Sequence, residues 1–317
     1  MNRLSRNIAV GLMALVMFGA SISAWGASNS GKSASKRSAV IEHIGDGEID
    51  WTNGMVLAVG EAVLQPASQE PNRALALLKA KTYARMIAIA HLLSAVQGTH
   101  IDYEATGKDL MDVNVMVREK IEGYVRQLET ISVDRVTEEG DVIIRVTVGS
   151  RLYGKSAPGT ALLREEAREM TESNRAPAKV TVDTSKSAVP ETDIIPAEQH
   201  GPFTSLIVDV RGLDVARAMS PKIRKADGSE VWGTLPVTID YAIETGILSY
   251  VDSLKSAKIN QRCGANPLII RAIGRAGGEA MCDVVVSEED AARIQSENSK
   301  TKFADQCKVI FIVDPNR

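Results

Sequence analysis

Two hairpin signals enclose two helical segments in the first half of the chain, and this order restricts the fold more than any other feature. Residues 48–59 alternate between apolar and polar around Asn53-Gly54, a dipeptide that accepts the positive φ angles of a tight hairpin turn. Residues 131–148 alternate around a turn at Glu138-Glu139-Gly140-Asp141. Since alternation buries one face of a strand and exposes the other, we expect helices to cover one face of an antiparallel sheet.

The long segment between the hairpins has helical spacing. Residues 72–97 contain an apolar stripe, which we expect to face the core: Leu75, Leu78, Met86, Ile89, Leu93 and Val96. Alanines fill much of the remaining surface and would allow another element to approach closely. A second helix is expected over residues 109–128.

The second half mixes strands and helices without regular alternation, which favours an α+β fold built from an antiparallel or mixed sheet with helices packed on one face. Strands are expected at 205–210, 267–273, 281–286 and 308–314, a hairpin around Asp227-Gly228, and helical segments over 239–254 and after Ser287. Ser287 followed by three acidic residues is typical of a helix start.

The first residues predict export. Arg3 and Arg6 precede an apolar run, Ile8–Ala20, that is shorter than the ~20 residues needed to span a bilayer, and small residues follow it. We interpret residues 1–27 as a cleavable secretory signal peptide that directs the protein to the periplasm or cell envelope, the alternative being an uncleaved anchor. The segment Gly26–Ser33 fits a phosphate-loop pattern, but it spans the expected cleavage point and lacks the strand–helix context that such a loop needs.

Composition divides the remaining chain into two α+β modules. We expect a flexible lead-in at 28–39, a first module at 40–154, a linker at 155–201 and a second module at 202–317. The linker is rich in Pro, Ser, Thr and charged residues, so it cannot bury much apolar surface. A short charged helix is expected within it, with Glu165, Glu166 and Glu169 on a solvated face.

The totals exclude several functions. The net charge of −3 and the absence of a basic stripe argue against nucleic-acid binding, and 4% aromatic residues provide no stacking platform. No HExxH, GxSxG or SxxK motif occurs, and no histidines or cysteines have metal-ligand spacing. We therefore predict no catalytic, cofactor-binding or metal-binding residues and no enzyme activity.

The three cysteines all lie in the second module. In an oxidising compartment one disulfide and one remaining thiol is the default expectation, and three pairings are open. We favour Cys282 with Cys307, because both flank predicted strands. The alternative is that Cys263 and the other two are buried thiols.

One charged pair in the second module is a candidate contact for a partner or ligand. Asp209 and Arg211 end an apolar strand and, being two residues apart, share a face. They could form an ion pair, bind a polar ligand or partner, or hold the Ser220-Pro221 segment.

The first module resembles the family of small outer-envelope lipoproteins with a twenty-kilodalton founder, and it is similar to the N-terminal region of flagellar assembly protein T. The features that carry the resemblance are Trp51 in the hairpin, the helix Ala74–Val96 with Lys79-Ala80-Lys81, and Gly98 before Ile101. The second module resembles a domain that often follows in delta-type bacterial relatives, through residues 205–213, 220–223, 266–270 and 283–286. The lipidated N-terminal cysteine of the lipoproteins is missing.

This resemblance implies an envelope location, no cofactor and no catalytic residues. We expect a periplasmic or outer-membrane-associated structural or assembly factor whose partners are envelope or flagellar basal-body proteins. Peripheral membrane association and the oligomeric state stay open. The alternatives are a periplasmic small-ligand binding or sensing protein that uses the second module and, third, an unrecognised hydrolase.

Overall fold

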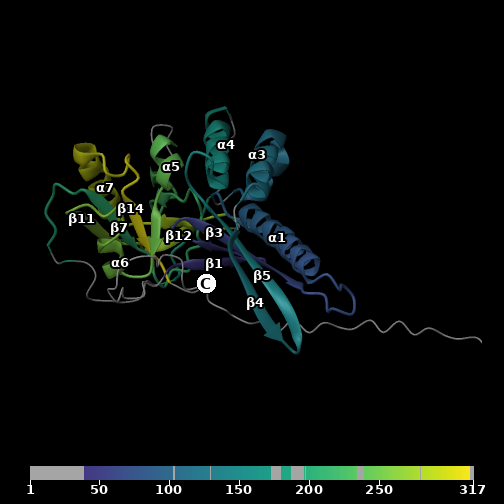
Figure 1. Ribbon diagram of the computed structural model, residues 1–317. Helices are drawn as coiled ribbons and strands as arrows, with labels where there is room; N and C mark the ends of the chain where they lie inside the picture. The colour runs from purple at the N-terminus through teal and green to yellow at the C-terminus, as the bar shows by residue number, and fades with distance from the viewer. Residues whose placement is uncertain are drawn as a thin grey trace, which may run out of the picture. The chain divides into compact units, whose positions relative to one another are not determined.

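The computed structural model describes residues 39–102, 104–128, 130–172, 180–186, 196, 198–233, 239–278 and 280–314. The predicted signal peptide, the phosphate-loop-like segment and nearly all of the lead-in lie outside these residues, as do large parts of the predicted linker. The described chain has an α+β fold, as expected (Figure 1).

The first half forms an antiparallel sheet in the order β1-β2-β3-β5-β4. Its strands are β1 (Ile41–Ile44), β2 (Gly47–Asp50), β3 (Met55–Val63), β4 (Thr130–Glu138) and β5 (Asp141–Arg151). Both predicted hairpins are confirmed. Gly54 has the positive φ of +62° that the first turn requires, and Gly140 has a φ of +93° in the second.

The helix α1 (Arg73–Gly98) packs on this sheet through its alanine face, which corrects the expected apolar stripe. The residues that it buries are Ala76, Ala80, Ala84, Ala88, Leu92, Ala95 and Val96. Of the expected stripe, Leu75, Leu78 and Met86 are exposed instead. The reason is close approach: a Cβ placed on Gly60 of β3 would lie 2.1 Å from the carbonyl oxygen of Ala84, so only small side chains fit between helix and strand.

Two shorter helices replace the single helix expected over residues 109–128. These are α2 (Gly107–Val113) and α3 (Val115–Arg126). Asn114 separates them, because its side-chain oxygen accepts hydrogen bonds from the backbone N–H groups of Met116 and Val117 and so caps a new helix.

The second half contains a parallel sheet and a mixed sheet within the described residues. The parallel sheet has the order β10-β14-β7-β11, with β7 (Ser205–Asp209), β10 (Ser249–Val251), β11 (Pro267–Arg271) and β14 (Val309–Ile312). The mixed sheet has the order β6-β12-β13-β8-β9, with β6 (Thr181–Asp183), β8 (Ile223–Arg224), β9 (Glu230–Trp232), β12 (Gly274–Gly277) and β13 (Asp283–Val285). The helices are α5 (Ile239–Thr245), α6 (Leu254–Lys258) and α7 (Glu288–Thr301). The expected cap of α7 is confirmed, since the Ser287 hydroxyl accepts a hydrogen bond from the Asp290 N–H.

The helix α4 (Pro158–Glu172) lies between α3 and α5, inside the segment expected to be a linker (Figure 1). Leu162 and Leu163 are fully buried. Glu165 and Glu166 are buried as well, so the expectation that they line a solvated face is wrong. The cause is that α4 packs against neighbours on more than one side.

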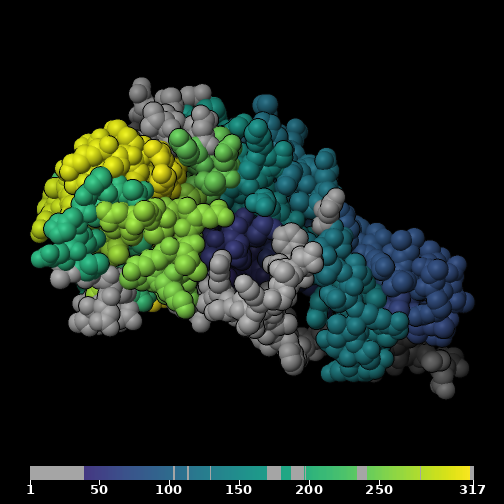
Figure 2. Space-filling model, turned by 60° about the vertical axis from the view of Figure 1, so that its left-hand side comes forward, coloured from purple at the N-terminus to yellow at the C-terminus, as the bar shows by residue number. Residues whose placement is uncertain are grey.

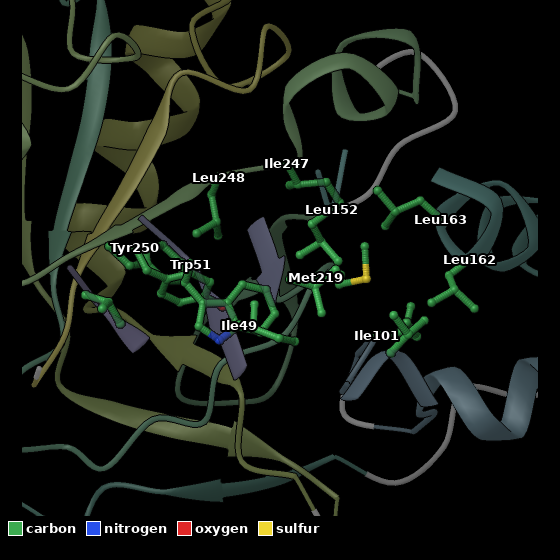
Figure 3. Packing of buried hydrophobic residues seen from close by; sticks show 14 of the residues in the cluster. Ile49, Trp51, Ile101, Leu152, Leu162, Leu163, Met219, Ile247, Leu248 and Tyr250 are labelled. Atoms are coloured by element: carbon green, nitrogen blue, oxygen red, sulfur yellow. The ribbon is translucent and has the colours of Figure 1, made fainter. Parts of the chain in front are cut away.

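Residues from 38 onward form one compact unit, and its largest cluster of buried apolar side chains has members from both halves. The rings of Trp51 and Tyr250 meet edge to face with centroids 5.4 Å apart, and the Thr52 hydroxyl donates a hydrogen bond to the Tyr250 carbonyl. Figure 3 shows this ring pair, with Met219 near Leu152 in the same cluster. On the surface, the purple N-terminal strands lie between the green residues of the second half and the teal β4–β5 hairpin (Figure 2).

None of the helices among the described residues has both the length and the apolar composition needed to cross a membrane.

Candidate functional site

A pocket of about 240 Å³ opens at the carboxyl ends of the neighbouring parallel strands β7 and β14. Its lining comes from the segments that follow these two strands and consists of Val210, Gly212, Asp214, Val215, Arg217, Val313 and Asp314. The carboxyl edge of a parallel sheet is the usual place for ligands, because the loops that leave the strands converge there. The pocket therefore lies at the sheet edge where ligands commonly bind in such folds.

Asp209 ends β7, one residue before the lining residue Val210, and the structure brings it together with Arg211 as the sequence suggested. The Arg211 Nε lies 2.9 Å from Asp209 Oδ1, and the Arg211 Nη2 lies 3.1 Å from Oδ2. The Asp209 side chain is only 3% exposed. Of the three readings of this pair, the ion pair is the one that the structure contains.

A second arginine that the sequence analysis missed completes this ion pair. The Arg271 Nη2 lies 3.1 Å from Asp209 Oδ2, because Arg271 is the register partner of Asp209 across β11 and β7. Asp209 and Arg271 each end an apolar run of similar length, and this shared position could have predicted that the two residues are neighbours on paired strands.

Asp314, which follows β14, and Arg217, in the segment that follows β7, also line the pocket. The Gly212 N–H donates to Asp314 Oδ2 at 2.9 Å, and the Arg217 Nη2 donates to the Asp314 carbonyl oxygen at 2.6 Å. Arg217 is 2% exposed, so its guanidinium forms part of the inner wall. Arg217 and Asp314 are 97 residues apart in the sequence, so their spacing did not predict this contact.

Asp214, which also lines the pocket, is held in place by two cations. Its carboxylate lies 2.7 Å from Lys186 Nζ and 2.9 Å from Arg275 Nη1. Arg275 also contacts Asp183, whose pKa is lowered to about 2, first because the Ser185 hydroxyl and N–H donate to it and then because of Arg275. The pocket lining thus combines the compensated Asp214 carboxylate with apolar surface from Val210, Val215 and Val313.

Residues 205–315 match the family described as Treponema pallidum Tp0624, second domain. The match covers about a third of the chain, and no curated protein matches the chain. The Tp0624-like segment begins at the first residue of β7 and extends past β14, so it contains the whole lining of the pocket.

All three cysteines lie in the Tp0624-like segment, and the structure contains no disulfide among its described residues. The predicted Cys282–Cys307 bond is therefore not formed. Both cysteines flank strands as predicted, but Cys282 precedes β13 of the mixed sheet and Cys307 precedes β14 of the parallel sheet, so the two strands belong to different sheets. Burial raises the pKa of Cys282 well above its usual value and that of Cys307 to about 11.

A group of buried carboxyls lies where α4 meets the Tp0624-like segment. Burial, and then the negative charge of Asp102, raise the pKa of Glu166 well above 4.5, while Ser220 and Lys222 act in the opposite direction. Burial also raises the pKa of Asp102.

The third carboxyl of this group, Asp283, is held by basic neighbours. Its Oδ2 accepts from Arg224 Nε at 2.6 Å, and its Oδ1 accepts from the Lys222 N–H at 2.9 Å. Burial nevertheless raises its pKa, more than Arg224 lowers it. Across the described chain, no three His, Cys, Asp or Glu side chains are grouped so that they could hold a metal ion.

Proposed function

We propose that the protein is a non-catalytic structural or assembly factor of the bacterial envelope, periplasmic or associated with the outer membrane, that acts by protein–protein contact. The observation that carries this proposal is the outer face of α1. Leu78, Tyr83 and Met86 are about 60% exposed there, and Leu75 and Ile87 also reach solvent. Large apolar side chains gathered on one exposed helix face are typical of a surface that a partner covers.

The charge of α1 adds to this argument. The helix contains Arg73, Lys79, Lys81 and Arg85 and no acidic residue. Apolar side chains bordered by basic ones favour a partner whose contact surface is apolar with an acidic rim. The apolar and basic side chains of α1 point away from the sheet because the alanine face of the helix is the one that packs against β3.

The envelope location rests on the signal peptide predicted at residues 1–27. The resemblance to the outer-envelope lipoproteins and to flagellar assembly protein T suggests envelope or flagellar basal-body proteins as partners. Cell fractionation tests this part of the proposal. A protein that keeps its leader and stays in the cytosol would contradict it.

Site-specific photocrosslinking in cells tests the contact itself. A crosslinker at position 78 or 86 should capture one envelope or flagellar protein, identified by mass spectrometry, and one at Ile259 should not, although Ile259 is 55% exposed. The variant Leu78→Glu/Met86→Glu should lose the complex and keep its melting temperature, since exposed substitutions change stability by about 0.5 kcal/mol or less. Equal capture at positions 78 and 259, or an intact complex in the double variant, would contradict the proposal.

The pocket beside Asp209 favours a second candidate function, the binding of a small polar ligand. A thermal-shift screen of charged metabolites is the direct test, because a ligand at about 100 times its Kd stabilises the folded state by about 2.7 kcal/mol. The variant Val215→Phe, which fills the pocket, should abolish the shift. A screen without any shift, or a shift that Val215→Phe leaves unchanged, argues against this site.

A further inference from the structure

A second cavity, of about 300 Å³, lies between α3 and α4, which run side by side in Figure 1. It has three sources of lining: α3, the turn between β5 and α4, and the first turns of α4. It lies outside the Tp0624-like segment and is separate from the pocket beside Asp209. Neither the resemblance nor the proposed function uses it.

Each of the three sources contributes one cation to the cavity. Lys120 comes from α3, Lys155 from the turn and Arg164 from α4, and all three are exposed. Among the described residues, none of the three has a carboxylate within 4 Å. Positive charges that border one cavity repel each other, so an anion bound between them removes an unfavourable interaction.

Glu165, an acid whose pKa Lys120 affects, does not neutralise this set. Lys120 lowers the pKa of Glu165, but Arg168 lowers it more. The Glu165 carboxylate is bound by Arg168 and accepts a hydrogen bond from the side chain of Asn114 at 2.8 Å. Glu165 therefore belongs to a separate ion pair with the exposed Arg168, and it does not neutralise the cations around the cavity.

The floor of the cavity is apolar. Ile121 is 1% exposed and Ala157 is buried, while Pro158 and Ala161 add further carbon surface. The ring of Tyr124 forms one wall, and its hydroxyl accepts a hydrogen bond from Ser150 at 3.3 Å. A free inorganic ion would leave this floor in contact with water, whereas a ligand with an apolar part would cover it.

We propose that the cavity between α3 and α4 binds an amphiphilic anion, a phosphate or carboxylate joined to a short apolar group. The anionic head lies among Lys120, Lys155 and Arg164, and the apolar group lies on Ile121 and Pro158. This chemistry occurs in free alkyl phosphates and carboxylates and in the head region of anionic lipids.

Isothermal titration calorimetry of the mature full chain tests the proposal with hexyl phosphate, inorganic phosphate and hexanol. Hexyl phosphate should bind at least about tenfold more tightly than either of the others, because each of those supplies only half of the interaction. The binding should weaken as salt is added, since the head contacts exposed charges. Absence of hexyl phosphate binding, or equal binding of inorganic phosphate, overturns the proposal.

Three variants locate the site. Lys155→Gln/Arg164→Gln should weaken hexyl phosphate binding by about tenfold or more, since it removes two of three cations. Ala161→Phe, which fills the apolar floor without a charge change, should also weaken it. Lys81→Gln, which removes an exposed cation from α1, is the matched control and should bind as the wild type does. If Lys81→Gln lowers affinity as much as the double variant, the binding is non-specific and the proposal fails.

Two further probes identify the source of the anion. Sedimentation with phosphatidylglycerol vesicles that is lost in Lys155→Gln/Arg164→Gln and kept in Lys81→Gln supports a lipid source. Hexyl phosphate binding without vesicle binding supports a free small anion. Binding of an oligoglutamate peptide but of no alkyl anion would overturn the proposal in favour of an acidic protein segment.

Discussion

Replacing Gly60 by alanine tests the central packing contact of the first half, the alanine face of α1 against β3. A Cβ at position 60 would lie 2.1 Å from the Ala84 carbonyl oxygen and 2.4 Å from the Ala88 nitrogen, whereas ordinary contact begins at 3.4 Å. Both atoms belong to the backbone, so no side chain can rotate away. The helix has to move outward by roughly 1 Å, which costs about 2–3 kcal/mol, the upper part of the range for overpacked cores.

Thermal unfolding followed by circular dichroism measures this cost. A loss of this size should lower the melting temperature by roughly 5–10 °C in a protein of this length. Gly123→Ala is the matched control, because Gly123 lies inside α3 and a Cβ there meets nothing within 4 Å. The control should gain about 0.5–1 kcal/mol from the better helix propensity of alanine. If both variants melt alike, α1 does not rest on β3 through its alanines and the exposure of Leu78 and Met86 loses its explanation.

Three further predictions concern the buried charges and the thiols. The pKa of Glu166 in the folded protein lies above its ordinary value of 4.5, so between these two values the folded state binds a proton that the unfolded state has lost. The free energy of unfolding should therefore fall as the pH rises from 4.5 toward the raised pKa. In urea titrations Glu166→Gln should flatten this fall, and an unchanged pH profile would contradict the prediction. Asp209→Ala should cost about 3 kcal/mol, because it removes the Asp209 carboxylate from its ion pairs with both Arg211 and Arg271. Arg211→Ala removes one of these two pairs and should cost less in the same unfolding assay; the reverse order would contradict the ion-pair geometry. Because no disulfide joins Cys282 to Cys307 in the structure, iodoacetamide should alkylate all three cysteines of the unfolded, unreduced protein. Mass spectrometry counts the added groups, and a single added group would mean that a disulfide forms.

The parts of the fold that local chemistry decides could be predicted from the sequence. The turn at Asn53-Gly54 and the cap at Ser287 depend on residues within a few positions of each other, and both are present as expected. The α1 face could not be predicted in this way. Its orientation depends on Gly60, a residue of another element that admits only small side chains, and hydropathy alone favours the leucines.

The parallel sheet also escaped prediction, although the sequence contains a sign of it. The strands β7, β11 and β14 are continuous apolar runs, and such runs are typical of parallel strands that are buried on both faces. Because the pairing of β7 with β11 was not predicted, the sequence indicated only part of the charged group of Asp209, Arg211 and Arg271 at the sheet edge. Asp209 and Arg211 are neighbours in sequence, whereas Arg271 joins them only through the strand register.

The edge-to-face contact of Trp51 with Tyr250 means that the Tp0624-like segment cannot be separated from the first half of the chain without exposing apolar side chains. Excised from this chain, residues 205–315 would expose to water the apolar surface that Trp51, Leu152 and Leu162 now cover, including Tyr250 and Met219. Each 100 Å² of such surface costs about 2.5 kcal/mol in water. A protein in which this segment is joined to a different domain must therefore bury the same apolar side chains against that domain, or have polar residues in their place.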